Sequence, residues 1–144
     1  MKTKQAFWDT SAIVPLCAHE QTSLRARQIL LKHPQPVVWW GAIIESHSAL
    51  ARAHREGLLT VPQRDQAIRQ LERLSRAWIE ILPADEVRSL AVSLLQSYSL
   101  RTGDALQLAS ALVWCDEKPR RRAMICFDVR MADAAKQIGF NVIS

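Results

Sequence analysis

Four acidic residues stand where strands or helices are expected to end or begin, rather than in polar surroundings. Asp9 follows the apolar segment QAFW, and Asp128 follows the apolar segment AMICF. Glu45 and Asp104 lie near the starts of two segments with helical spacing of apolar residues. Carboxylate oxygens suit Mg²⁺ or Mn²⁺, and the sequence offers zinc no CxxC, HExxH or paired histidines. The four acids are therefore candidate ligands of a metal that acts on phosphodiesters.

Each acid also has a simpler structural interpretation. Asp9 and Asp128 would cap the helices that follow them, and Glu45 would be an exposed acid at the positive end of its helix. Asp104 would lie in the first turn after an N-cap at Thr102, yet its helix face continues through apolar residues. An unpaired buried carboxylate is costly, so capping and ligand roles both stay open at Asp104.

The elements that must position these acids alternate between strands and helices. Strands are predicted over 5–8, 34–40, 79–83 and 123–127, with a last one in FNVIS (140–144). Helices are predicted over 11–18 (with Pro15 in the first turn), 20–32, 41–57, 61–78, 84–99, 102–118 and 128–139. This alternation predicts an α/β fold with a central, mainly parallel sheet.

The predicted sheet explains why acids from four segments would meet. The runs VVWW and AMICF suit strands that are covered on both faces. In such sheets the functional crevice lies beyond the carboxyl ends of the strands. Asp9 and Asp128 would therefore meet the two acids at helix starts along one edge. Carboxylates brought this close repel one another unless a cation joins them.

Two apolar patterns predict packing faces. The segment 20–32 is expected to form an amphipathic helix through Leu24, Ile29, Leu30 and Leu31. A second stripe recurs at helical spacing through Ala67, Leu71, Leu74 and Trp78. This stripe would pack in the core or form a contact surface for a partner.

Length and composition predict a single domain over 1–144 that is globular and has no membrane-spanning helix or signal peptide. Three widely spaced cysteines form no disulfide framework and are expected to be buried or half-buried thiols, which fits the cytoplasm. The net charge of +5 favours a polyanionic partner such as nucleic acid. The basic run KPRRR (118–122) is either a solvated loop or a phosphate contact.

The segments FWDTSAIVPL, VVWWGAIIESHSALAR, LRTGDALQLASAL and ICFDVRMADAAKQIGFNVI resemble, in order and spacing, the motifs of PIN-domain nucleases. Among these nucleases they resemble the VapC toxins of bacterial toxin–antitoxin pairs, over essentially the whole chain. The resemblance implies a three-layer α/β/α fold and RNA cleavage that depends on Mg²⁺ or Mn²⁺. It also implies an antitoxin partner and a homodimer.

Residue by residue, the resemblance implies that Asp9, Glu45, Asp104 and Asp128 form the family's acidic quartet, with Ser11 as a supporting residue. Gly41 stands where many members have a Ser or Thr cap, which predicts a less tightly begun helix. Four arginines are candidate contacts to RNA phosphates: Arg130, Arg120, Arg121 and Arg122. Asp133 is expected at the surface, with Lys136 one turn on as a partner.

Two other classes of protein share parts of this pattern. Phosphotransferases of the haloacid-dehalogenase kind also begin with an aspartate after the first strand, but they need a second acid two residues on, where this chain has Ser11. A non-catalytic RNA-binding or regulatory protein fits the basic charge equally well. Such a protein has no use for four carboxylates at one sheet edge, because they would repel RNA without a metal.

Overall fold

The computed structural model describes residues 4–144, which form an α/β fold of five strands and seven helices. The elements follow in the order β1 (Gln5–Trp8), α1 (Thr10–Cys17), α2 (Ser23–Lys32), β2 (Gln35–Trp39), α3 (Ala42–Arg55), α4 (Val61–Ser75), β3 (Ile79–Ile81), α5 (Asp85–Ser97), α6 (Thr102–Trp114), β4 (Ala123–Ile125), α7 (Val129–Ile138) and β5 (Asn141–Ile143). Each predicted strand and helix is present, with shorter bounds in most cases.

The five strands form one sheet in the order β3-β2-β1-β4-β5, and all four strand pairs are parallel. Phe7 on β1 aligns with Val37 on β2 and with Met124 on β4. The chain moves outward in one direction from β1 to β3 and then returns to β4 on the other side of β1. The boundary between β1 and β4 is thus the topological switch point, where open α/β sheets form their binding crevice.

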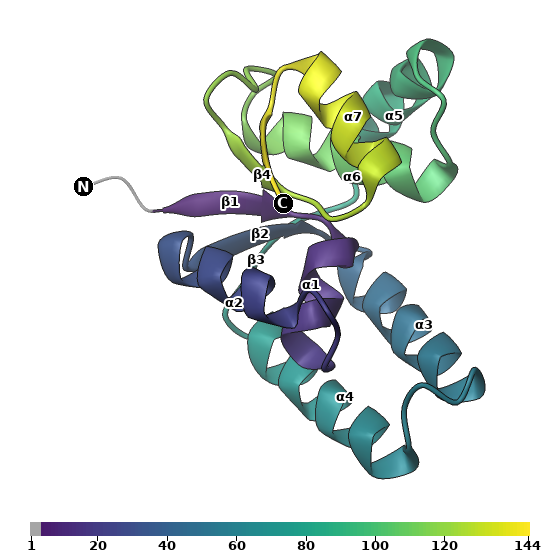
Figure 1. The fold of residues 1–144 in the computed structure, drawn as a ribbon. Helices are drawn as coiled ribbons and strands as arrows, with labels where there is room; N and C mark the ends of the chain where they lie inside the picture. Colours follow the sequence, from purple (N-terminus) through teal and green to yellow (C-terminus); the bar gives the residue numbers. More distant parts are fainter. Residues whose placement is uncertain (1–3) are drawn as a thin grey trace.

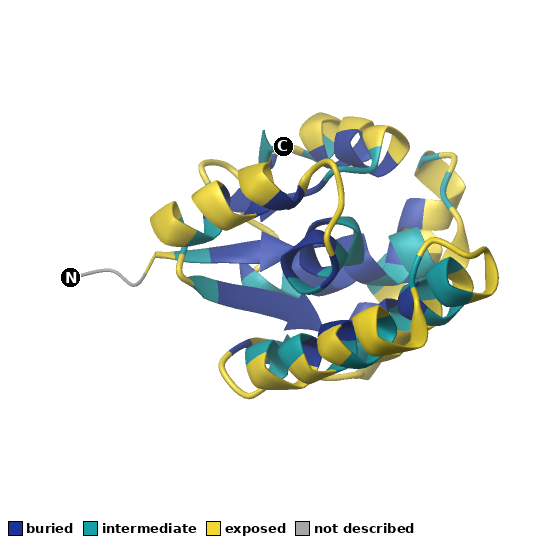
Figure 2. Ribbon diagram, turned by 60° about the horizontal axis from the view of Figure 1, so that its bottom comes forward, coloured by how far each residue is buried: buried dark blue, intermediate teal, exposed yellow. Residues whose placement is uncertain are grey.

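Helices cover both faces of the sheet and give the predicted three layers. Helices α1 to α4 lie on one face and α5 to α7 on the other (Figure 1). Alternate residues of each strand face opposite layers: Phe7 packs with the α5–α7 layer, and Ala6 and Trp8 pack with the α1–α4 layer. The central strands β1, β2 and β4 are mostly buried, while the edge strands and the outer helix faces are more exposed (Figure 2). This burial explains the continuous apolar runs in the sequence.

Helix α1 differs from its prediction. It begins at Thr10 with Asp9 as the N-cap, so Pro15 lies inside the helix rather than in its first turn. Proline has no N–H, so the Ser11 carbonyl loses its partner four residues on. The helix remains short and ends at Cys17.

The amphipathic prediction for α2 is wrong in part. Ile29 is buried at 1% exposure, but Leu24 and Leu31 are 64% and 84% exposed. Only one narrow side of α2 packs on the sheet, and the two leucines lie outside it. The stripe on α4 packs in the core, since Ala67, Leu71 and Trp78 are buried there.

The cysteines are free thiols, as predicted: Cys115 and Cys126 are buried and Cys17 is half-buried. None of the helices within residues 4–144 has the length and apolar character required to cross a membrane.

Candidate active site

A cleft of about 770 Å³ opens at the carboxyl ends of the strands, and all four candidate acids line it. Asp9 follows β1, and Asp128 is the N-cap of α7, which follows β4. Glu45 and Asp104 lie in the first turns of α3 and α6. The structure therefore brings the four acids together at the switch point, as the sheet argument predicts. What they do there stays a prediction.

Asp9 is the most buried of these acids, with 6% of its surface exposed. Its Oδ2 accepts a hydrogen bond from the Ser11 backbone N–H at 3.1 Å and faces the Cys126 thiol at 3.7 Å. Burial raises the pKa of Asp9, and the charge of Asp128 raises it further, while hydrogen bonds from Ser11 oppose the shift. A cation beside Asp9 would favour its ionised form.

Glu45 is held by an amide that the sequence analysis did not single out. The Gln107 side chain donates from Nε2 to Glu45 Oε1 at 2.9 Å and to Thr10 Oγ1 at 3.0 Å. The Thr10 hydroxyl donates to the same Glu45 oxygen at 3.5 Å. Burial raises the pKa of Glu45 to about 7, and the negative charges of Asp9 and then Asp104 add to the shift.

Gln107 itself is 1% exposed, and its Oε1 has no hydrogen-bond partner within residues 4–144. A lone amide on the apolar face of DALQLASAL was the sequence signal that could have identified it. Buried polar side chains are usually hydrogen-bonded, so a glutamine on a buried helix face indicates a polar partner across the interface.

Asp104 and Asp128 line the cleft, and each also caps the start of a helix. Asp128 Oδ1 accepts from the backbone N–H groups of Arg130 and Met131 at 3.0 and 3.2 Å. Asp104 Oδ2 accepts from the Arg101 backbone N–H at 3.3 Å. The N-cap of α6 is Arg101 rather than the predicted Thr102, which is already helical. Capping fixes both carboxylates at the mouth of the cleft.

Ser11 joins the two strand ends that carry Asp9 and Asp128. Its Oγ accepts a hydrogen bond from the Phe127 backbone N–H at 2.9 Å, while its own N–H bonds Asp9. The start of α1 is thereby tied to the segment between β4 and α7. Beside this tie, burial raises the pKa of the Cys126 thiol to about 12, so the sulfur stays protonated at neutral pH.

Gly41 begins α3 without a side-chain cap, as predicted, and the structure supplies a steric reason. A Cβ built at position 41 would lie 2.3 Å from Nε1 and 2.8 Å from Cε2 of the Trp39 indole. The indole therefore occupies the space that a Ser or Thr side chain would need. The first turn of α3 still closes, since the Glu45 backbone N–H donates to the Gly41 carbonyl at 3.0 Å.

These carboxylates suit a divalent cation that keeps several bound waters better than one whose ligands all come from the protein. Within residues 4–144 no three His, Cys, Asp or Glu side chains converge into a ready metal-binding group. Two of the carboxylates, Asp104 and Asp128, also accept hydrogen bonds from backbone N–H groups at helix starts. Mg²⁺ commonly takes one or two carboxylates and keeps several waters. Asp9 and Glu45 both have raised pKa values, which nearby positive charge would offset.

The predicted arginines separate into two places. Arg130 is exposed in the first turn of α7, next to Asp128. Arg120, Arg121 and Arg122 instead line a pocket at the opposite edge of the sheet, where the strands begin. That this loop contacts RNA phosphates stays a prediction, and the loop lies at the other end of the strands from the acids. The loop precedes β4, whereas the cleft lies beyond the end of that strand.

The cleft lining adds two charged residues that the sequence analysis missed, Arg52 on α3 and Glu20 between α1 and α2. Arg52 follows Glu45 by seven residues, a spacing that returns it to the same helix face. Asp133 is exposed on α7 and is not part of the lining.

An all-parallel sheet in this order, with helices on both faces and acids grouped at its switch point, defines the PIN-like class of α/β/α domains. Comparison with a solved toxin–antitoxin complex from Klebsiella pneumoniae shows the same fold. Its TM-score is 0.62, with 19% sequence identity and coverage of 96% of each chain.

The sequence is similar to Ribonuclease VapC46 of Mycobacterium tuberculosis, with 34% identity over 140 residues. The match covers 96% of this chain and 95% of that protein. No family model matches the sequence. At this identity and coverage, the chain belongs to the VapC family of PIN-domain nucleases.

Proposed function

We propose that this chain is a ribonuclease toxin that hydrolyses RNA phosphodiester bonds with Mg²⁺ or Mn²⁺. The observation that carries the proposal is the convergence of Asp9, Glu45, Asp104 and Asp128 on one cleft at the switch point. The similarity to a protein named as a ribonuclease supports the same activity. All of residues 1–144 would form the single catalytic domain.

The four acids would contact the cation in two ways. Asp9 and Asp104 would be the main ligands of the cation, with Glu45 and Asp128 binding it directly or through water. When bound, such a cation supplies an acidified water and neutralises charge on the phosphate. Ser11 keeps Asp9 and Asp128 in register through its bonds to both strand ends.

Glu45 is suited to accept the proton of the attacking water. Burial and the charges of Asp9 and Asp104 raise its pKa in the metal-free site to about 7, and a bound cation would lower it toward the ionised form that a base requires. The Gln107 amide fixes Oε1 of Glu45, which leaves Oε2 as the free oxygen. Arg52 and Arg130 would contact phosphates on either side of the scissile bond.

The direct test is cleavage of an end-labelled RNA by the wild-type protein and by Asp9→Asn, with Mg²⁺, with Mn²⁺ or with EDTA. We expect wild-type cleavage with either metal, none with EDTA, and a loss of at least about 100-fold in Asp9→Asn. Asp133→Asn is the matched control, because that acid is exposed outside the cleft. Full activity of Asp9→Asn would overturn the assignment. RNA binding that no divalent ion affects would favour a non-catalytic RNA-binding protein.

We further propose that the chain pairs with an antitoxin protein and forms a homodimer. The fold similarity to a toxin–antitoxin complex supports the first partner. Its site of action would be the cytoplasm, where three free thiols remain reduced. Expression of the chain alone should arrest growth, and Asp9→Asn should relieve the arrest. Sedimentation at micromolar concentration tests the dimer.

A further inference from the structure

A second charged hollow lies at the opposite edge of the sheet from the cleft. It has a volume of about 930 Å³ and is bounded by the first residues of three strands, Gln5, Ala123 and Asn141. The length of the strands, about 13 Å for the four residues of β1, separates it from the acids. This second hollow, here called the basic groove, takes no part in the site described above.

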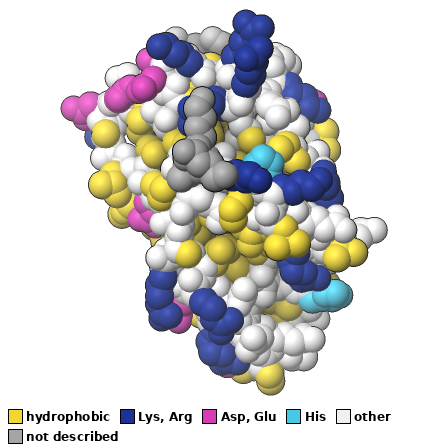
Figure 3. Space-filling model, turned by 90° about the vertical axis from the view of Figure 1, so that its left-hand side faces the viewer, with side chains coloured by type: hydrophobic (Ala, Val, Ile, Leu, Met, Phe, Trp, Pro, Cys, Tyr) yellow, Lys and Arg dark blue, Asp and Glu magenta, His cyan; other side chains and the backbone are white. Residues whose placement is uncertain are grey.

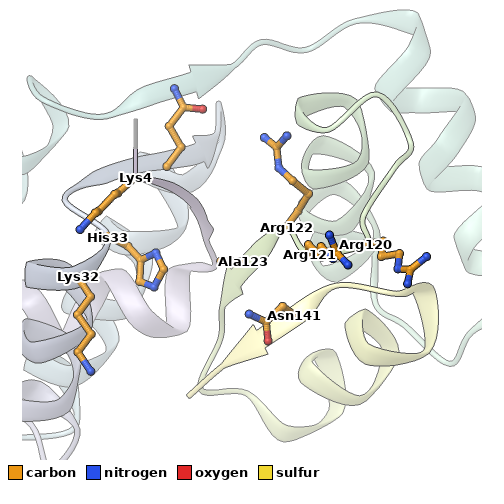
Figure 4. Close-up of a pocket in the computed structure, with 9 residues that line it drawn as sticks. Lys4, Lys32, His33, Arg120, Arg121, Arg122, Ala123 and Asn141 are labelled. Carbon is orange, nitrogen blue, oxygen red and sulfur yellow. The ribbon is translucent and has the colours of Figure 1, made fainter. Parts of the chain in front are cut away.

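The basic groove is lined by cations from three separate segments, and its lining residues include no acid. One side carries Lys4, Lys32 and His33, and the other carries Arg120, Arg121 and Arg122 (Figure 4). Lys and Arg side chains are spread over this face of the molecule, as Figure 3 shows. None of these five Lys and Arg side chains forms a salt bridge within residues 4–144. Their charge is therefore available to an external anion.

Arg122 is held in place rather than carried on an open loop. The Arg122 guanidinium lies 4.2 Å from the Trp114 ring centre, and Trp114 Nε1 donates to Gln5 Oε1 at 3.1 Å. The Arg122 backbone N–H bonds the Pro119 carbonyl, and its own carbonyl accepts from Asn141. These contacts pre-organise the basic side of the groove against the start of β1.

The backbone of this connection is also strained. Asp116, Glu117 and Arg121 have φ values of 53°, 57° and 65°, in the left-handed region that non-glycine residues avoid. Such conformations cost free energy and persist where the surrounding structure fixes them, often at binding sites. Two of these residues, Asp116 and Glu117, precede the run of arginines that lines the groove, and Arg121 belongs to it.

The positive charge of the groove also affects the pKa of His33. Burial lowers the pKa of His33, and the positive charges of Lys4 and Lys32 lower it further. An anion in the groove would offset those charges and raise the pKa of His33. His33 can therefore report occupancy of the groove.

We propose that the basic groove is a second RNA site, which binds the phosphate backbone of substrate RNA outside the segment that is cleaved. The proposal rests on the proposed ribonuclease function. RNA is the favoured occupant because the charged residues that line the catalytic cleft are five acids and one arginine, so the cleft itself contributes little attraction for a polyanion. The residues that line the groove include no Trp, Tyr or Phe, and Arg122 covers the nearby Trp114 ring. Recognition therefore depends on phosphates and is independent of sequence.

The test measures binding separately from cleavage. A fluorescent 20-nucleotide single-stranded RNA is titrated, with EDTA present, against Asp9→Asn alone and against Asp9→Asn combined with Lys32→Gln, Arg120→Gln and Arg121→Gln. Three lost phosphate contacts should weaken binding at least about tenfold and reduce the salt slope by about 2. In Asp9→Asn, RNA should also move the His33 titration upward.

The matched control replaces three arginines on and after α4, Arg69→Gln, Arg73→Gln and Arg76→Gln, in the same background. These side chains are exposed and lie outside the groove, and the net charge falls equally. The control should bind RNA within about twofold of its parent. Equal weakening in both triple variants would overturn the proposal, because net charge alone would explain it.

Two further outcomes have separate meanings. One would show that the groove binds another ligand, and the other would contradict only the proposed ribonuclease function. If polyglutamate of 20 residues binds more tightly than RNA and depends on the groove cations, the occupant is an acidic protein segment and the proposal is wrong. In cleavage assays without Asp9→Asn, the groove variant should lose kcat/KM on the 20-nucleotide RNA but not on a six-nucleotide RNA. Absence of cleavage by the wild-type protein would contradict the proposed function, while the binding result would still decide the groove.

Discussion

Gln107 Nε2 lies 2.9 Å from Glu45 Oε1, so that an amide on α6 holds a carboxylate on α3 across the cleft. The same nitrogen reaches Thr10 at the start of α1. One buried side chain thus connects elements from both helix layers at the point where the strands end. Its donors favour the ionised form of Glu45 and oppose the effect of burial.

Replacing Gln107 with methionine should lower RNA cleavage by about 10- to 100-fold, the loss expected for one hydrogen bond to a charged group. Without the donor, the pKa of Glu45 rises, so the acid limb of the pH–rate profile should move to higher pH. Gln107→His keeps an N–H donor and should restore part of the activity. Gln96→Met on the exposed face of α5 is the control. An unchanged pH profile in Gln107→Met would show that the amide does not act through Glu45.

Glu45 should make the metal-free protein less stable as the pH rises. Its folded-state pKa of about 7 lies above the ordinary value of 4.5, so the folded state binds more protons in this interval. The free energy of unfolding contributed by Glu45 is therefore fully present below pH 4.5 and declines up to pH 7. Urea denaturation in EDTA should show a smaller decline for Glu45→Gln, whereas Glu72→Gln, an exposed control, should match the wild type. Equal slopes in wild type and Glu45→Gln would refute the burial argument.

Gly41→Ala should destabilise the fold because the new methyl group meets the Trp39 indole at 2.3 Å. Overpacking of this kind costs about 1–3 kcal/mol. Trp39→Leu removes the obstacle, so the double variant should cost less than the sum of the two single variants. Urea denaturation of all four proteins gives the coupling energy. Strict additivity would mean that α3 shifts away from the indole.

Ser11→Ala should lower both stability and metal affinity. The Phe127 N–H loses its acceptor, and an unpaired, partly buried amide costs about 1–3 kcal/mol. Asp128 follows Phe127 directly, so its position relative to Asp9 should become less defined. Ser11→Thr retains the hydroxyl and should preserve Mg²⁺ binding measured by calorimetry, and Ser93→Ala on exposed α5 is the control. If Ser11→Ala binds Mg²⁺ as tightly as the wild type, Ser11 contributes to local stability but does not position the metal ligands.

The order of elements and the meeting of the four acids were predictable, because both follow from periodicity and from the rule for parallel sheets. Asp9 and Asp128 come directly after apolar strands, and the carboxyl ends of parallel strands share one edge of the sheet. That β1 and β4 are neighbours comes from the structure. Helix bounds were less accurate: Pro15 suggested a helix start, but the Asp9 cap begins α1 earlier.

Other features depend on contacts between distant segments that local patterns do not reveal. The bond from Gln107 to Glu45 joins residues separated by 62 positions. The indole that excludes a side chain at Gly41 depends on the path of β2 into α3. The sequence identified the KPRRR run as a candidate for phosphate contact. It did not predict at which end of the strands the run lies, which the structure shows to be the end where β4 begins. Leu24 and Leu31 satisfied helical spacing and still face outward, because spacing does not determine how much of a helix is covered.

The segregation of charge along the strands has a consequence for handling this protein. The basic groove and the acid-lined cleft lie at opposite ends of the same rigid sheet. On an extended anionic support, such as a cation-exchange resin or a phosphate-coated chip, the molecule should attach by its basic end. Attached in that orientation, the protein turns its acids toward the solvent, so an immobilised sample should keep its cleft open to divalent cations.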